Sequence, residues 1–223
     1  MDNNQKEQVK IKKQKMTLAN KITIARICLI PIMVLMILIP GLNNPSKTVF
    51  LKMTVGQLIF AILFIIASLT DFLDGYLARS RNEITTFGKF LDPIADKILV
   101  LTALLFILKF PYWADGVQNR YMNNIIIGVL VIIVREFIIT GIRLLAVDRG
   151  IVIAASPLGK VKTLATMVAI IVMLFNGFTI IDAIQEGVFD YISMSLFWIA
   201  IALTVISGVD YLIRNREVIL ESI

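Results

Sequence analysis

The stretch LIFAILFIIASLTDFLDGYLAR, residues Leu58–Arg79, passes from an apolar run into two aspartates, and GKFLDPIAD, residues Gly88–Asp96, carries two more soon afterwards. Both stretches belong to hydrophobic segments, and one ionised carboxylate at the centre of a membrane costs about 3 kcal/mol on insertion scales. Lys97 is the only lysine that adjoins any of these aspartates within its segment. The missing positive charge is supplied most simply by one or two bound divalent cations.

The composition is that of a membrane protein. Hydrophobic residues make up 58% of the 223 residues and the mean hydropathy is +0.85, which is too apolar for a soluble domain of this length. A helix needs about 20 apolar residues to cross a bilayer. The segments that reach about this length are Ile22–Pro40, Val49–Leu77, Phe90–Lys109, Asn124–Leu145, Lys162–Ile181 and Tyr191–Leu212. We therefore expect an all-α polytopic membrane protein whose six transmembrane helices form one domain, residues 19–214.

The residues that flank this domain are polar. Residues 1–18 are rich in lysine and predict a basic juxtamembrane segment on anionic membrane lipids, although a solvated tail fits the same residues. No cleavable signal peptide is visible, and residues 215–223 form a short tail.

The distribution of basic residues predicts the orientation. With the N-terminus in the cytoplasm, the 22 lysines and arginines all fall on the cytoplasmic side except Lys47, Lys52, Lys109 and Arg120. This bias predicts a protein of the cell membrane with both termini cytoplasmic and its acidic site facing the cytoplasm. The positive charge is spread over the loops between spans, which argues against a nucleic-acid partner.

The inventory of metal and redox ligands is narrow. There is no histidine, which excludes an imidazole base and the usual kinds of zinc site. The single cysteine, Cys28, lies in the first apolar segment and cannot form an intramolecular disulfide. Protein ligands to a metal would therefore be carboxylates, whose hard oxygens select Mg²⁺, Mn²⁺ or Ca²⁺.

Helical geometry predicts matched depths for the acids of the second and third segments. The loop between these segments lies near Ser80–Phe87, with Asp71 eight residues before Arg79 and Asp96 eight residues after Gly88. At 1.5 Å per residue, both acids lie about 12 Å along their helices from the loop. The other two, Asp74 and Asp92, are each about one turn nearer the cytoplasm.

Local features of the two helices add to this arrangement. Pro93 lacks a backbone donor, which predicts that the third helix begins about a turn earlier, near Lys89, with Asp92 by its N-terminus.

The alternatives to a metal site are ion pairs with basic residues and a proton relay in a transporter. Against a relay, the acids gather at one leaflet and the two halves of the chain have no evident inverted repeat.

The residues resemble a known family at this point. DFLDGYLAR from Asp71 to Arg79, followed by GKFLDPIAD from Gly88 to Asp96, is similar to the complete signature of the CDP-alcohol phosphatidyltransferases. The resemblance also extends to the number of spans and the topology. It implies that a phosphatidyl group moves from CDP-diacylglycerol to an alcohol hydroxyl with release of CMP.

The resemblance implies roles for individual residues. The ligands of two divalent cations, Mg²⁺ or Mn²⁺, would be Asp71, Asp74, Asp92 and Asp96, and Asp96 would also be the general base. The CDP-diacylglycerol site would include Gly75, Ala78, Arg79 and Gly88. Asn20 and Thr23 resemble the family's Asn-x-x-Thr element that helps to bind the nucleotide, although Asn20 fits a helix cap as well. The family also implies a homodimer.

Basic residues of the second half suggest the acceptor. Arg135, Arg143, Lys160 and Lys162 lie toward the same cytoplasmic side and suit a phosphate on the acceptor. The alternatives are ordinary snorkelling for Arg143, Lys160 and Lys162, and pairing of Arg135 with Glu136 or an aspartate.

The segments around these residues, from Val134 to Arg143 and from Val152 to Thr163, resemble the family branch that makes phosphatidylglycerophosphate. That resemblance implies sn-glycerol 3-phosphate as the acceptor. The alternatives are a cardiolipin synthase of the same fold, whose acceptor is phosphatidylglycerol, and a cation-coupled transporter.

Overall fold

The computed structural model describes residues 17–43, 48–50, 53–80, 86–109, 117–148, 151, 153, 156–175 and 188–216. Within these residues the long helices are α1 (Leu18–Leu38), α2 (Val55–Ser80), α3 (Thr86–Lys109), α4 (Val117–Asp148), α5 (Pro157–Leu174) and α6 (Val188–Arg214). A short 3-10 helix η1 (Pro40–Asn43) and two short antiparallel strands, β1 (Thr48–Phe50) and β2 (Met53–Thr54), lie between α1 and α2. The predicted all-α architecture is confirmed, with this small hairpin as an addition.

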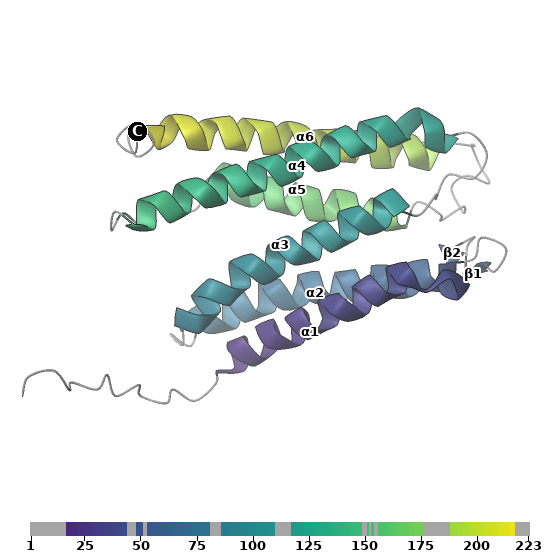
Figure 1. Ribbon diagram of the computed structural model, residues 1–223, viewed down its shortest axis with the longest axis horizontal. Helices are drawn as coiled ribbons and strands as arrows, with labels where there is room; N and C mark the ends of the chain where they lie inside the picture. The colour runs from purple at the N-terminus through teal and green to yellow at the C-terminus, as the bar shows by residue number, and fades with distance from the viewer. Residues whose placement is uncertain are drawn as a thin grey trace, which may run out of the picture.

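The helices lie side by side along one direction (Figure 1). α1 packs against α2 and α3, and α6 packs against α4 and α5, while α2 and α3 join the two groups through α4 and α5. The start of α1, the end of α2 and the start of α3 lie at one end of the molecule, together with the end of α4, the start of α5 and the end of α6 (Figure 1). The helix ends that border the segments predicted to be cytoplasmic therefore share one end.

Many outward-facing side chains are large and apolar. Leu35 is 52% exposed, Leu130 55% and Phe137 68%, as expected for helix faces that meet lipid. Four described helices are long and apolar enough to cross a membrane, within the ranges Asn20–Leu38, Met122–Ala146, Pro157–Leu174 and Tyr191–Arg214. This confirms a multi-pass all-α membrane fold. The six-span count stays a prediction, because the apolar part of α2 is shorter and α3 carries several charges.

The core joins both helix groups. The rings of Phe60 on α2 and Phe106 on α3 stack with centroids 3.8 Å apart, and Ile132 and Ile170 bring α4 and α5 into the same buried cluster. Gly128 lets α4 approach α6 closely, since a Cβ there would lie 2.4 Å from the Cδ1 atom of Ile201. Small residues at such contacts are typical of helix packing in membranes.

The second helix begins later than the hydropathy predicted. Apolar residues from Val49 onward were expected to be helical, but the β1–β2 hairpin precedes α2. Thr54 and Gln57 form a reciprocal cap, with the Gln57 amide donating to Thr54 Oγ1 at 3.2 Å and the Thr54 amide donating to Gln57 Oε1 at 3.3 Å. This cap starts α2 at Val55.

The start of α3 corrects a second prediction. The helix begins at Thr86, so Pro93 lies inside it and Asp92 is in its second turn. The expectation that Asp92 lies by a helix N-terminus is therefore wrong. Proline removes one backbone hydrogen bond from the ladder of α3, and the helix nevertheless continues on both sides of it.

Two helix starts depend on side-chain caps. The Thr17 hydroxyl accepts from the Asn20 amide at 3.3 Å and begins α1, so Asn20 is not a capping residue and that alternative is wrong. Ser156 caps α5 by accepting from the Gly159 amide at 3.1 Å, with Pro157 at the first helical position. α5 therefore begins before the predicted Lys162.

Candidate active site

The first acid of the signature forms an ion pair across the α1–α2 contact. Arg26 NH1 of α1 donates to Asp71 Oδ1 of α2. The Arg26 side chain is fully buried, whereas 31% of the Asp71 side chain is exposed. The sequence identifies Arg26 only as one of the positive charges on the cytoplasmic side. Its ion pair with Asp71 could not be predicted from it. The pair supplies part of the positive charge that the acids require.

A second contact links α1 to α3. Thr23 Oγ1 donates to Asp92 Oδ1 at 2.9 Å. Thr23 is 2% exposed and Asn20 is 8% exposed, so both predicted nucleotide-site residues are buried near the start of α1. The Thr23 hydroxyl is thereby brought into contact with one of the signature aspartates.

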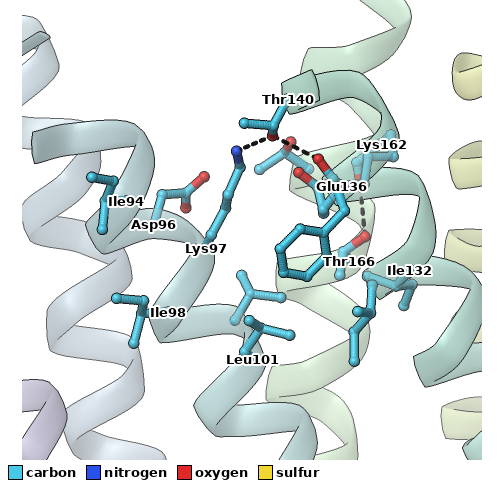
Figure 2. Close-up of a pocket in the computed structure, with 14 residues that line it drawn as sticks. Ile94, Asp96, Lys97, Ile98, Leu101, Ile132, Glu136, Thr140, Lys162 and Thr166 are labelled. Atoms are coloured by element: carbon cyan, nitrogen blue, oxygen red, sulfur yellow. Dashed lines mark hydrogen bonds and ion pairs between the residues drawn. The ribbon is translucent and has the colours of Figure 1, made fainter. Parts of the chain in front are cut away.

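Asp96 lies on α3 between the two helix groups. Its carboxylate points from α3 toward the side on which Glu136 and Lys162 lie (Figure 2). Its Oδ1 atom is buried and has no hydrogen-bond partner among the residues that the structure describes. A buried carboxylate oxygen without a partner is costly, and a cation or a substrate proton would remove that cost.

The remaining signature residues lie in helices, but their side chains are outside the described part of the structure. They are Asp74, Gly75, Ala78 and Arg79 in α2 and Gly88 in α3. Because α2 is a continuous helix through Ser80, residues 71, 74, 75 and 78 fall within an arc of about 100°. Their roles at the metals and at CDP-diacylglycerol stay predictions.

A cavity of about 710 Å³ brings together acids and bases that are far apart in the sequence. Asp71 and Asp96 line it from α2 and α3, and the basic residues that line it are Lys97, Arg135, Arg143 and Lys160. Three of the predicted acceptor residues thus share one cavity with two of the predicted metal ligands.

A smaller cavity of about 290 Å³ lies beside it, between α3, α4 and α5. Asp96, Lys97 and Glu136 line both cavities, whereas Lys162, the fourth predicted acceptor residue, lines only the smaller one. Lys97 donates to the Thr140 hydroxyl, which in turn donates to the Glu136 carbonyl oxygen at 2.6 Å (Figure 2).

Glu136 contacts two of the basic residues that are predicted to bind the acceptor. Its Oε1 atom accepts from Arg135 NH1 at 3.1 Å and from Lys162 Nζ. Lys162 is buried, and a buried ammonium needs such a counter-charge. The predicted pairing of Arg135 with Glu136 is therefore present, and Lys162 is a buried ion-pair partner and not a snorkelling lysine.

Helix α6 supplies further contacts that could not be predicted from the sequence. Arg135 NH2 donates to Ser207 Oγ at 3.1 Å, and Arg143 Nε donates to the Tyr211 hydroxyl at 3.4 Å. Serine and tyrosine are common in helices of all kinds, and neither residue belongs to a motif with a characteristic spacing. Their contacts with the arginines of α4 arise only from the packing of α4 against α6.

The residues present fit a divalent cation in their chemistry. Asp71, Asp92 and Asp96 offer the hard oxygen ligands that Mg²⁺ and Mn²⁺ prefer, and the Asp96 Oδ1 atom has no hydrogen-bond partner among the described residues that would compete with a cation. The described side chains contain no group of three or more acidic residues close enough to hold an ion. The side chain of Asp74 is not among the described side chains to which this statement applies.

Comparison with known proteins identifies the class. Residues 16–206 match the CDP-alcohol phosphatidyltransferases, and the chain belongs to that family. The CDP-diacylglycerol–glycerol-3-phosphate 3-phosphatidyltransferase of Bacillus subtilis (strain 168) is 42% identical over 205 residues, which cover 90% of this chain and 95% of the relative. The protein of the same name from Rickettsia felis is 36% identical over 198 residues, or 87% of this chain and 92% of the relative.

A more distant relative of the same name comes from Shigella flexneri serotype 5b. It is 31% identical over 202 residues, which cover 90% of this chain and 95% of the relative. The predicted family is thus confirmed, and so is the prediction that the chain is a phosphatidyltransferase. The names of the relatives agree with the predicted branch of the family.

Proposed function

We propose that this protein transfers the phosphatidyl group of CDP-diacylglycerol to sn-glycerol 3-phosphate, giving phosphatidylglycerophosphate and CMP. The observation that carries the proposal is the large cavity in which Asp71 and Asp96 face Arg135, Arg143 and Lys160. The acidic side suits cations that accompany a pyrophosphate, and the basic side suits a second, phosphate-bearing substrate. The names of relatives that cover most of the chain support the same reaction.

Asp96 is the general base in this proposal. It accepts the proton of the glycerol 3-phosphate hydroxyl while the hydroxyl oxygen forms a bond to the phosphatidyl phosphorus and the bond to CMP breaks. A carboxylate is a reasonable base here because the chain has no histidine. The position of Asp96 in the cavity, with Oδ1 buried and without a hydrogen-bond partner among the described residues, supports this role.

Two divalent cations, Mg²⁺ or Mn²⁺, would be held by Asp71, Asp74, Asp92 and Asp96. When bound, they would neutralise the pyrophosphate and stabilise the charge that develops on departing CMP. The chain's own contribution is to hold these carboxylates, with Arg26 on Asp71 and Thr23 on Asp92.

Substrate binding is divided between two groups of residues. The donor site would consist of Asn20, Thr23, Gly75, Ala78, Arg79 and Gly88, around the start of α1 and the cytoplasmic ends of α2 and α3. The acceptor site would consist of Arg135, Arg143, Lys160 and Lys162, from α4 and α5. Both Arg135 and Lys162 donate to the same Glu136 oxygen, which holds these two cations near each other for a phosphate.

The membrane arrangement follows from the charge bias. We propose six spans with both termini and the active site at the cytoplasmic face of the cell membrane. Residues 1–18 would lie on anionic lipids, and the protein would be a homodimer as the family resemblance implies. The start of α1 and the end of α6 lie at the same end of the molecule, which fits two termini on one side of the membrane (Figure 1).

The test is CMP release by purified protein supplied with CDP-diacylglycerol and a panel of acceptors. Release that depends on glycerol 3-phosphate and gives phosphatidylglycerophosphate supports the proposal. Release that depends on phosphatidylglycerol instead would identify a cardiolipin synthase. No release with any acceptor, combined with cation-dependent transport in vesicles, would favour the transporter.

A further inference from the structure

We propose that helix α6 determines how tightly the acceptor binds. Ser207 and Tyr211 act as positioning residues that hold Arg135 and Arg143 of α4 against the large cavity. This inference rests on the proposed function, because it takes the acceptor phosphate as the ligand of the two arginines. Ser207 and Tyr211 themselves need not touch the substrate.

In the hydrogen bond between Arg135 and Ser207, the serine hydroxyl is held in one orientation by a second hydrogen bond. Arg135 NH2 donates to Ser207 Oγ at 3.1 Å, and Ser207 Oγ donates to the Thr204 carbonyl oxygen at 3.1 Å. A hydroxyl has one proton, so the bond to Thr204 turns the oxygen lone pairs toward the guanidinium. Ser207 is 1% exposed, so its hydroxyl cannot turn toward solvent and bond to water instead.

Gly208 provides the space for this arginine. A Cβ atom at Gly208 would lie 3.2 Å from Arg135 Cγ and 3.9 Å from its Nε. An alanine at this position would push the stem of Arg135 away from α6. The combination of a hydroxyl and a missing side chain in successive residues therefore fixes both the head and the stem of one arginine.

Arg143 is held by a different residue of the same helix. Its Nε donates to the Tyr211 hydroxyl at 3.4 Å, and its Cζ lies 5.7 Å from the centroid of the Tyr211 ring. Tyr211 is 2% exposed, whereas Arg143 is exposed. The contact uses Nε, so it does not occupy the two terminal nitrogens with which an arginine also grips a phosphate.

Both contacts come from one face of α6. Ser207 and Tyr211 are one helical turn apart, and α6 packs along α4. Arg135, Arg143 and Tyr211 all line the cavity that contains Asp71 and Asp96. α6 thus sets the position of the two arginines of α4 relative to Asp71 and Asp96, although none of the residues of α6 belongs to the aspartate signature.

The first experiment removes one hydroxyl at a time. We expect Ser207→Ala and Tyr211→Phe each to raise the KM for glycerol 3-phosphate by about three- to ten-fold, with kcat and the KM for CDP-diacylglycerol changed by less than about two-fold. Thr204→Val is the matched control on α6, because the Thr204 hydroxyl donates to Ala200 of its own helix at 2.7 Å. It should leave both KM values unchanged.

The second experiment adds one methyl group. Gly208→Ala removes no polar group, yet it should raise the KM for glycerol 3-phosphate because it displaces Arg135. Gly141→Ala on α4 is the matched control, since a Cβ atom there has no neighbour within 4 Å. Tyr211→Phe and Gly208→Ala keep the core filled, so a thermal unfolding curve for each separates a local effect from a loss of fold.

The outcomes distinguish this inference from the proposed function. If the wild type uses glycerol 3-phosphate but Ser207→Ala, Tyr211→Phe and Gly208→Ala leave its KM unchanged, the inference is wrong and the proposed function stands. A parallel rise in the donor KM would also overturn it, because the effect would then be general. A wild type that does not use glycerol 3-phosphate would overturn the proposed function and this inference with it.

Discussion

Arg26 on α1 donates to the carboxylate of Asp71 on α2, and the arginine side chain is fully buried while 31% of the aspartate side chain is exposed. The pair joins the helix that precedes the aspartate signature to the first acid of that signature. The guanidinium also offsets part of the free-energy cost of placing carboxylates in an apolar segment. Arg26 is therefore part of the architecture of the site as well as a cytoplasmic positive charge.

We expect Arg26→Gln to destabilise the protein by about 3 kcal/mol, because it leaves Asp71 without its guanidinium partner. The figure is at the lower end for buried pairs, since Asp71 is partly exposed. Arg214→Gln is the control: Arg214 is 64% exposed in its pair with Asp210, so its loss should cost less than about 1 kcal/mol. Unfolding in detergent measures both, and equal losses would contradict a special role for Arg26.

Thr23 should act through Asp92. We expect Thr23→Val to lower kcat/KM for CDP-diacylglycerol by about tenfold, because it removes the hydroxyl that donates to Asp92 while keeping the volume. Thr23→Ser keeps the hydroxyl and should retain most of the activity. If valine and serine have the same effect, the hydroxyl has no role at Asp92.

The predicted metal ligands should each be essential. Asp71→Asn, Asp74→Asn, Asp92→Asn and Asp96→Asn each remove a charge but little volume, so we expect inactive proteins that still insert into the membrane. Chelation of divalent ions should inactivate the wild type, and added Mg²⁺ or Mn²⁺ should restore it. CMP release that continues in chelator would contradict a metal-dependent site.

The acceptor site is tested best at Arg143, whose side chain is exposed and lines the large cavity. A charge-assisted hydrogen bond contributes about 1.5–3 kcal/mol, so Arg143→Gln should raise the KM for glycerol 3-phosphate by about ten- to hundred-fold. Arg143→Lys should recover only part of this, because an ammonium cannot grip a phosphate in a bidentate way. Glycerol should be a poor acceptor. If glycerol and glycerol 3-phosphate are used equally, Arg143 and the other basic residues of the acceptor site serve only to orient the protein in the membrane.

The sequence predicted the helices well and their ends less well. Hydropathy locates long apolar runs because the bilayer selects for length and apolarity. It does not separate a short hairpin from the helix that follows, so Val49 was placed in a helix that begins at Val55. The rule for proline likewise placed the start of α3 too late, because Pro93 lies inside a helix that already begins at Thr86.

The acids of the site were predictable and most of their partners were not. The spacing from Asp71 to Asp96 is local, and the family signature identifies it. The contacts of Arg26 with Asp71, and of Tyr211 with Arg143, connect residues far apart in the chain. A single sequence contains no signal for such a pairing, since it depends on which helices pack together and at what depth.

The central claim is tested most directly by following isotope-labelled glycerol 3-phosphate into lipid, with wild type and Asp96→Asn side by side. The account predicts that wild-type protein produces labelled phosphatidylglycerophosphate only when CDP-diacylglycerol and a divalent cation are present. It also predicts that Asp96→Asn gives no more label than a sample without protein. Labelled lipid from the wild type in chelator, or from Asp96→Asn at the wild-type rate, would contradict it.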